Sequence, residues 1–163
     1  MPFRFPVEFE RPVSITNVGN QDEARVSRRR LDLYNIHVSG GFVVPQNSVW
    51  YLQALRARFV TSALAGNRFP VIAVSEVDLD GNTIEIVRHH VATQIASLEY
   101  RVFCSPEMEN SNDGTAVNAV MWVAYRNIPK IPLLAGSEIT FTVVGALLGD
   151  YIDANVWVNE VIV

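Results

Sequence analysis

The fold is decided by residues 48–62, which read Ser48-Val-Trp-Tyr-Leu-Gln-Ala-Leu-Arg-Ala-Arg-Phe-Val-Thr-Ser62. Apolar side chains recur here at every second position, a period typical of an extended strand with one buried face. The apolar set shifts by one position along the stretch, from Trp50, Leu52 and Ala54 to Leu55, Ala57 and Phe59. Because a slip of one residue turns later side chains to the opposite face, this shift predicts a β-bulge beyond Ala54.

The same alternation recurs on both sides of this stretch. We expect further strands over residues 30–38, 69–77, 83–88, 92–103, 116–125, 137–144 and 152–163. Residues 116–125 are nearly all apolar, which predicts a central strand buried on both faces. Helical periodicity is scarce, so the sequence predicts an all-β antiparallel sandwich. Long strands with longish connections favour a jelly roll over an immunoglobulin-like domain, whose Cys…Trp…Cys pattern is missing.

The composition indicates more apolar surface than one small domain hides. The 163 residues fit one domain; 49% of them are hydrophobic and 18% charged, against roughly 25% charged in a typical soluble domain. Lys130 is the only lysine, and the other twelve basic residues are arginines. Arginine is favoured in interfaces because its planar guanidinium is weakly hydrated and pairs bidentately, although a GC-rich genome gives the same bias.

Two classes of partner are not expected. The net charge of −4 argues against nucleic acid. The longest apolar run, residues 119–125, is seven residues long, far short of the roughly 20 that span a bilayer as a helix. We therefore expect no nucleic acid and no membrane partner.

Residues 1–30 differ from residues 31–163 in composition and in apolar patterning, so we expect an extended N-terminal arm followed by the sandwich domain. Prolines at positions 2, 6 and 12 disfavour helix and interior strand. The apolar positions of the arm nonetheless alternate, at Phe3, Phe5, Val7 and Phe9. Such an edge suits strand addition to a neighbouring chain, or an arm folded back onto its own sandwich. The cluster Arg28-Arg29-Arg30 fits a salt-bridged or partner-binding patch.

No group of residues specifies a reaction. His89 and His90 are adjacent, so on a strand they point to opposite faces and do not share a metal ion, and His37 is remote in sequence. Residues 78–82, Asp-Leu-Asp-Gly-Asn, begin like a calcium loop, but the expected strands on both sides indicate a hairpin turn.

The remaining candidates also have structural interpretations. Asp150 and Asp153 lie where a turn leads into the last strand. Cys104 is the only cysteine and fits a small buried apolar side chain, with no intrachain disulfide. We therefore predict no catalytic, cofactor-binding or metal-binding residue, no cofactor, and a protein that is not an enzyme.

Several segments together resemble a group of small virion proteins of tailed bacteriophages. They are Trp50-Tyr-Leu-Gln-Ala54, Arg58-Phe-Val-Thr-Ser62, Ala65-Gly-Asn-Arg-Phe-Pro-Val71, Asp80-Gly81, Leu133-Leu-Ala-Gly-Ser-Glu-Ile-Thr140, Gly149-Asp150 and Asn155-Val-Trp-Val-Asn-Glu160. The resemblance is one of general sequence character over residues 48–163, and it does not extend to the arm.

The resemblance implies a structural protein of the phage head, a decoration (cement) protein that is made in the host cytoplasm and binds the major capsid protein on the capsid surface. Such proteins commonly sit at three-fold positions, so we expect a homo-oligomer, a trimer. The alternatives are a head–tail or tail component, and a carbohydrate-binding jelly-roll module in which Trp50, Tyr51 or Trp157 stacks on sugar. A cupin-like enzyme is a more distant alternative.

Overall fold

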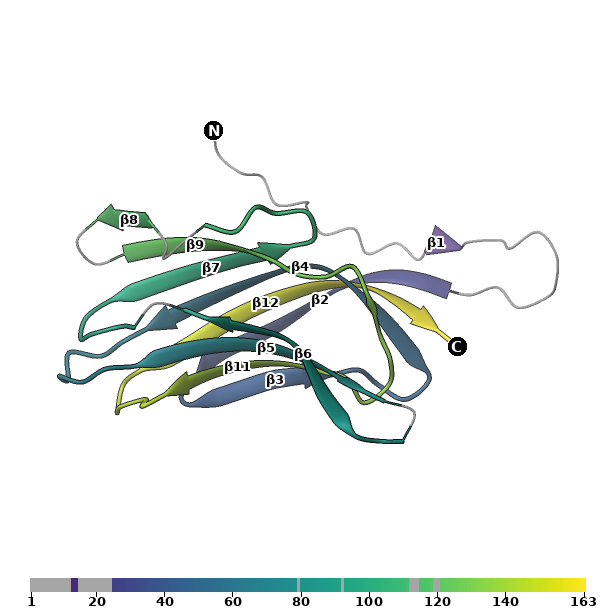
Figure 1. Cartoon of the computed structure of the whole chain (residues 1–163), viewed down its shortest axis with the longest axis horizontal. Helices are drawn as coiled ribbons and strands as arrows, with labels where there is room; N and C mark the ends of the chain where they lie inside the picture. The colour runs from purple at the N-terminus through teal and green to yellow at the C-terminus, as the bar shows by residue number, and fades with distance from the viewer. Residues whose placement is uncertain (1–12, 15–24, 79, 92, 112–114, 119–120) are drawn as a thin grey trace.

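The computed structural model of the chain describes residues 13–14, 25–78, 80–91, 93–111, 115–118 and 121–163. Every regular element that these residues form is a β-strand, and the strands make two sheets that pack together (Figure 1). The predicted all-β sandwich is therefore confirmed. Residues 1–12 and 15–24, which make up most of the expected arm, lie outside the described residues.

The two sheets differ in size. The strands of the large sheet, from edge to edge, are β1 (Val13–Ser14), β2 (Arg25–Ile36), β12 (Tyr151–Ile162), β4 (Ser48–Val60), β7 (Glu99–Ser105), β9 (Met121–Asn127) and β8 (Thr115–Asn118), and β10 (Pro132–Leu133) also pairs with β4. Those of the small sheet are β3 (Ser39–Val43), β11 (Glu138–Val144), β5 (Phe69–Val77) and β6 (Thr83–His90). Neighbours are antiparallel except β7 and β9, which are parallel.

β4 contains the predicted bulge, one residue earlier than expected. Trp157 of β12 lies opposite Ala54, but the next residue, Val158, lies opposite Leu52, so Gln53 is the inserted residue. Ala54 therefore leaves the buried face that the sequence assigned to it and stands opposite Trp157 on the outer face. The shift of the buried side chains along β4 is confirmed.

The apolar residues 116–125 do not form the expected central strand. β8 and β9 are instead antiparallel neighbours, and β8 is the last strand of the large sheet. Within β9 only Ala124 is fully buried. An apolar run has the same composition as one long strand or as two short strands that pair, so periodicity alone does not separate the two. The pairing leaves only the short β8 at this edge.

β2, the first long strand, and β7 also begin at other residues than the sequence predicted. β2 begins at Arg25, so residues 25–30, which we placed in the arm, pair with β12. β12 has twelve residues, and its second half needs a hydrogen-bonding partner on the side away from β4. Residues 93–98 precede β7 rather than belong to it, and a single bridge joins Gln94 to Arg68 there; residue 92 of the predicted strand lies outside the described residues.

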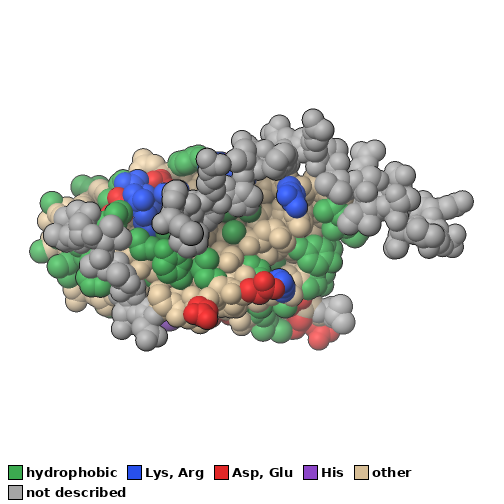
Figure 2. Space-filling view, turned by 90° about the horizontal axis from the view of Figure 1, so that it is seen from above, with side chains coloured by type: hydrophobic (Ala, Val, Ile, Leu, Met, Phe, Trp, Pro, Cys, Tyr) green, Lys and Arg blue, Asp and Glu red, His purple; other side chains and the backbone are tan. Residues whose placement is uncertain are grey.

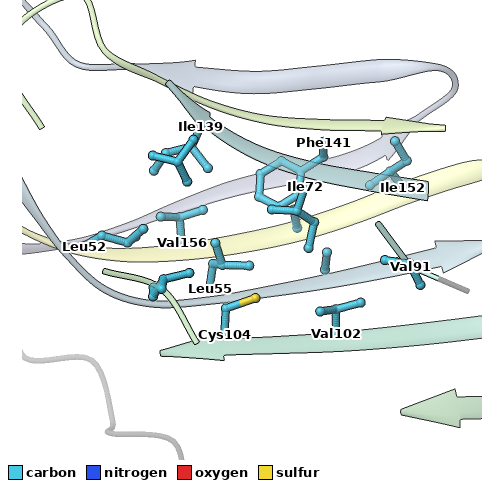
Figure 3. Packing of buried hydrophobic residues seen from close by; sticks show 14 of the residues in the cluster. Leu52, Leu55, Ile72, Val91, Val102, Cys104, Ile139, Phe141, Ile152 and Val156 are labelled. Atoms are coloured by element: carbon cyan, nitrogen blue, oxygen red, sulfur yellow. The ribbon is translucent and has the colours of Figure 1, made fainter. Parts of the chain in front are cut away.

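The sheets bury one apolar core between them (Figure 3). The large side chains buried in it come from strands of both sheets: Leu55, Phe59, Ile72, Ile139, Phe141 and Ile152. Cys104 lies in the same core with 1% of its surface exposed, and burial raises the pKa of its thiol to about 12. The prediction that this cysteine is a small buried side chain is confirmed.

Among the described residues, four connections meet at the left end of the sandwich in Figure 1, at residues 37–38, 61–68, 93–98 and 145–150. We call this end the loop end. Hydrogen bonds tie two of the connections to each other and a third to β11. The Thr61 hydroxyl donates to the carbonyls of Ile95 (2.6 Å) and Leu98 (3.2 Å). The backbone N–H of Val143 donates to the Val38 carbonyl (2.9 Å).

Candidate functional site

A buried ion pair joins two connections of the loop end. Arg68 and Asp150 have side chains that are 0% and 1% exposed, and Nε of the arginine donates to Oδ2 of the aspartate at 2.9 Å. The other Arg68 nitrogens donate to Asp150 Oδ1, the Gly66 carbonyl and the Ser62 hydroxyl. Asp150 also accepts the backbone N–H groups of Ser62 (2.7 Å) and Leu147 (2.8 Å).

These contacts decide the charge state of Asp150. Burial alone would raise the pKa of its carboxyl, but the hydrogen bonds from Arg68 and from the backbone of Leu147 and Ser62 outweigh burial and lower the pKa to about 2. The aspartate is therefore ionised, and its charge is balanced by Arg68. The pair fixes the connections 61–68 and 145–150 relative to each other.

Large apolar side chains are exposed on the connections of the loop end and at the adjoining strand ends. They are Val38 (48% exposed), Leu64 (50%), Phe69 (44%), Ile95 (59%), Val144 (55%) and Leu148 (81%). Val144 pairs directly with Phe69. In Figure 2, hydrophobic side chains show as separate patches among polar side chains and backbone. Exposed apolar groups that gather in one place mark interaction surfaces.

A second feature lies on the outer face of the large sheet. A hollow of about 350 Å³ is lined by Arg30, Tyr34, Arg56, Arg58, Arg101, Asp153 and Asn155. Strand register brings these residues together: Arg56 stands opposite Asn155 of β12 and Phe103 of β7, and Arg58 stands opposite Asp153 and Arg101. We call this surface the arginine face.

Three of the four arginines are paired with carboxylates. Arg58 donates to Glu99 at 2.9 Å and to Asp153 at 3.1 Å. Arg101 also donates to Glu99, and Arg30 donates to Asp32 at 2.8 Å. The hydrogen bond from Arg58 is the main reason why the pKa of Glu99 lies below its ordinary value.

Arg56 differs from the other three arginines. It has no salt bridge within the described part of the chain, and its guanidinium lies over the Phe103 ring, 5.9 Å from the ring centre. Burial and the like charges of Arg101 and Arg58 lower the pKa of Arg56 from its ordinary value. The arginine face therefore holds a cation that its surroundings disfavour.

The histidines occupy separate structural positions. His37 Nδ1 is hydrogen-bonded to the Asp150 carbonyl (2.8 Å), and His89 Nε2 to the Asn127 carbonyl (2.8 Å). Burial lowers the pKa of His89, whereas His90 is exposed at the end of β6. Among the described residues, no group of three or more His, Cys, Asp or Glu side chains is placed to hold a metal ion.

The acidic candidates are separated too. The carboxylate of Asp78 accepts the backbone N–H groups of Asp80 (2.9 Å) and Asn82 (2.7 Å), which closes the β5–β6 connection as the predicted hairpin turn. Asp150 lies in the buried ion pair, whereas Asp153 lies on the arginine face and accepts the backbone N–H of Asn35 (2.9 Å). The two do not form a carboxylate pair.

The aromatic candidates for sugar stacking are in three different environments. Trp50 is 2% exposed, and its Nε1 donates to the buried carboxylate of Glu160 at 3.0 Å, so its ring is not a platform for a ligand. Tyr51 is 43% exposed. Trp157 lies on the outer face beneath Arg30, whose guanidinium carbon is 5.7 Å from the ring centre.

The cluster Arg28-Arg29-Arg30 is divided between the two faces of β2. Arg29 donates to both carboxylate oxygens of Glu160 (2.9 and 2.8 Å), and Arg30 belongs to the arginine face. The salt-bridged interpretation of the cluster therefore holds for these two residues. Sequence reasoning did not find the Arg68–Asp150 pair or the role of Arg56, because each depends on residues that are far apart in the chain.

Comparison of the chain with models of protein families, with curated proteins and with solved structures finds no match. The described part of the chain contains no helix long and apolar enough to cross a membrane. The arrangement of the described residues is therefore the basis on which a function is assigned.

Proposed function

We propose that the protein is a non-catalytic structural component of a bacteriophage virion, a decoration protein that binds the major capsid protein on the capsid surface. The observation that carries this proposal is the loop end, where six large apolar side chains are exposed on a surface that would join copies of the protein on the capsid. Exposed apolar groups favour protein association, and the two connections that the buried ion pair fixes lose little conformational entropy on binding. The resemblance of residues 48–163 to small virion proteins supports the choice of partner.

We further propose that the sandwich is a jelly roll. β2, β12, β4 and β7 are adjacent in the large sheet, and β3, β11, β5 and β6 are adjacent in the small sheet. Along these eight strands the chain changes sheet at every step except from β5 to β6. This order supports two Greek keys, the arrangement of jelly rolls in viral capsid and lectin domains. β8, β9 and β10 are then an insertion between β7 and β11.

The proposed oligomer is a homotrimer. Its support is the apolar surface of the loop end together with the three-fold positions that decoration proteins commonly occupy on icosahedral shells. The arm, shortened to the residues before Arg25, is proposed to attach the protein to neighbouring subunits. In this arrangement the loop end meets another subunit, and the arginine face stays accessible to a further partner.

The function is tested on purified virus particles by quantitative mass spectrometry. A decoration protein should be present in hundreds of copies, at a fixed ratio to the major capsid protein. A few copies per particle would indicate a head–tail or tail component instead, and absence from the particle would overturn the proposal.

The loop end is tested by two matched substitutions at exposed apolar positions. Leu148→Asp alters the loop end, and Val163→Asp alters the opposite end, where the side chain is similarly exposed (81% and 77%). A charge buried in an apolar interface is strongly unfavourable, so Leu148→Asp should shift sedimentation from oligomer to monomer at micromolar concentration. Val163→Asp should leave the oligomer intact, and the same behaviour of both variants would contradict the assignment of the loop end.

A further inference from the structure

We infer that the hollow of the arginine face binds a single carboxylate, supplied by an acidic side chain of a partner protein. The inference names the surface of this protein that meets the partner. It rests on the proposed function for the identity of the partner. The hollow measures about 350 Å³, which is at the small end of the roughly 300–1,000 Å³ of ligand sites. Its lining is almost entirely polar, which suits a charged group rather than an apolar one.

The charge balance of the arginine face sets the charge of the ligand. Four arginines line the hollow, and they are accompanied by three carboxylates, those of Asp32, Glu99 and Asp153. Among the described residues the difference, 4 − 3, leaves one positive charge. One carboxylate neutralises that charge, whereas a phosphate dianion reverses its sign. The balance therefore favours a monoanion.

The hydrogen-bond donors that would receive the carboxylate belong to Arg56 of β4, whose neighbour on the same face of the strand is Arg58. Arg56 has no salt bridge within the described residues, and a guanidinium over a ring keeps its N–H donors for another group. Nε of Arg58 is buried and has no hydrogen-bond partner in the described structure. The Arg56 guanidinium is therefore the donor that an incoming carboxylate would meet, and Arg58 adds positive charge beside it.

The polar groups that would bind sugar hydroxyls are already occupied. Asp153 accepts hydrogen bonds from Asn35 and Arg58, and the side-chain amide of Asn155 donates to Asp32. A sugar needs several such groups for its hydroxyls, whereas a carboxylate needs cationic donors. Tyr34, 62% exposed beside the hollow, offers an apolar contact for the methylene groups of a glutamate. The arrangement therefore favours an acidic protein side chain over a carbohydrate.

The site is tested with the full chain and two blocked tripeptides, N-acetyl-Gly-Glu-Gly-amide and N-acetyl-Gly-Gln-Gly-amide, followed by NMR of the backbone amides and arginine Nε–H groups. We expect saturable shifts at Arg56 with the glutamate peptide and binding weaker by about tenfold with the glutamine peptide, which lacks the charge-assisted pair. Inorganic phosphate at a pH where it is a dianion is the third ligand, and it should bind more weakly than the glutamate peptide.

The variants separate a specific site from general charge attraction. Arg56→Gln should weaken binding of the glutamate peptide by about tenfold. The control Arg88→Gln removes an exposed arginine of the small sheet that is already paired with Glu85, and it should leave binding unchanged. Arg56→Lys keeps the charge but loses the two-pronged geometry, so its binding should be intermediate. If Arg56→Gln does not fold, the affinity of Arg56→Lys for the glutamate peptide decides whether the site exists.

Each other outcome is informative. Equal binding of the two peptides, tighter binding of phosphate, or full binding by Arg56→Gln or Arg56→Lys overturns the inference. If the wild-type protein binds virus particles and a folded Arg56→Gln variant binds them equally well, the site is wrong while the proposed function stands. If the wild-type protein does not bind particles, the proposed function fails, and the peptide titration alone decides whether the carboxylate site exists.

Discussion

The molecule holds arginine–carboxylate pairs in two surroundings, at the loop end and on the arginine face. At the loop end, Arg68 and Asp150 are buried, equal in charge and bonded at every guanidinium nitrogen. On the arginine face, Arg58 and Asp153 keep 30% and 26% of their side-chain surface exposed, and arginines outnumber carboxylates among the described residues. The first arrangement is complete within the chain, whereas the second leaves a charge for a partner.

The difference shows why buried charge and exposed charge have different consequences. Removing one member of a buried pair leaves an uncompensated charge in a medium of low polarity, which is strongly unfavourable. Exposed pairs contribute little to stability because water screens them and long side chains lose entropy when they are held. The loop-end pair should therefore dominate stability, and the arginine face should dominate binding.

The largest effect is expected for Asp150→Asn. The variant keeps an acceptor oxygen but leaves the charge of Arg68 buried without a counter-charge, so the free energy of unfolding should fall by about 3–5 kcal/mol. Urea unfolding followed by circular dichroism measures this loss. Asp153→Asn on the arginine face is the matched control, with an expected loss below about 1 kcal/mol. Losses of equal size would remove the distinction between the two surroundings.

Acid should destabilise the protein through the same pair. The pKa of Asp150 is about 2 in the folded protein against an ordinary 3.8, and this difference corresponds to about 2.4 kcal/mol of stability. Because the folded-state pKa is the lower one, that stability is fully present above about pH 5 and is lost as the pH falls through about 4 toward 2. Urea unfolding from pH 6 to pH 2.5 should show a steeper loss for the wild type than for Asp150→Asn. Parallel curves would contradict the assignment.

Local patterns predicted the parts of the fold that depend on which side chains face inward. The alternation of residues 137–144 and 152–163 appears in β11 and β12, and the change of phase in β4 appears as the bulge at Gln53. The division of residues 116–125 into β8 and β9 was not predictable, because an apolar run does not show where it turns. The start of β2 was also missed, since it follows from the length of β12.

The charged features needed information that no single segment carries. Arg68 and Asp150 are 82 positions apart, and the sequence shows only an arginine before one strand and a Gly-Asp turn before another. The crowding of Arg56 depends on the register of β2, β12, β4 and β7 together. Composition shows one general feature, the excess of arginine over lysine, which favours an interface without locating it and is equally typical of a GC-rich genome.

The smallest effect is expected for the stability of Arg56→Gln. Burial and the charges of Arg101 and Arg58 lower the pKa of Arg56, so the folded protein disfavours its charged form, and removing the charge relieves that repulsion. The contact with Phe103 is lost in return and offsets part of the gain. The free energy of unfolding should therefore change by less than about 0.5 kcal/mol. Added salt should bring wild type and variant closer, because it screens repulsion between exposed charges. A loss above about 2 kcal/mol would show that Arg56 is a stabilising partner within the fold, and the arginine face would then have no charge left for another protein.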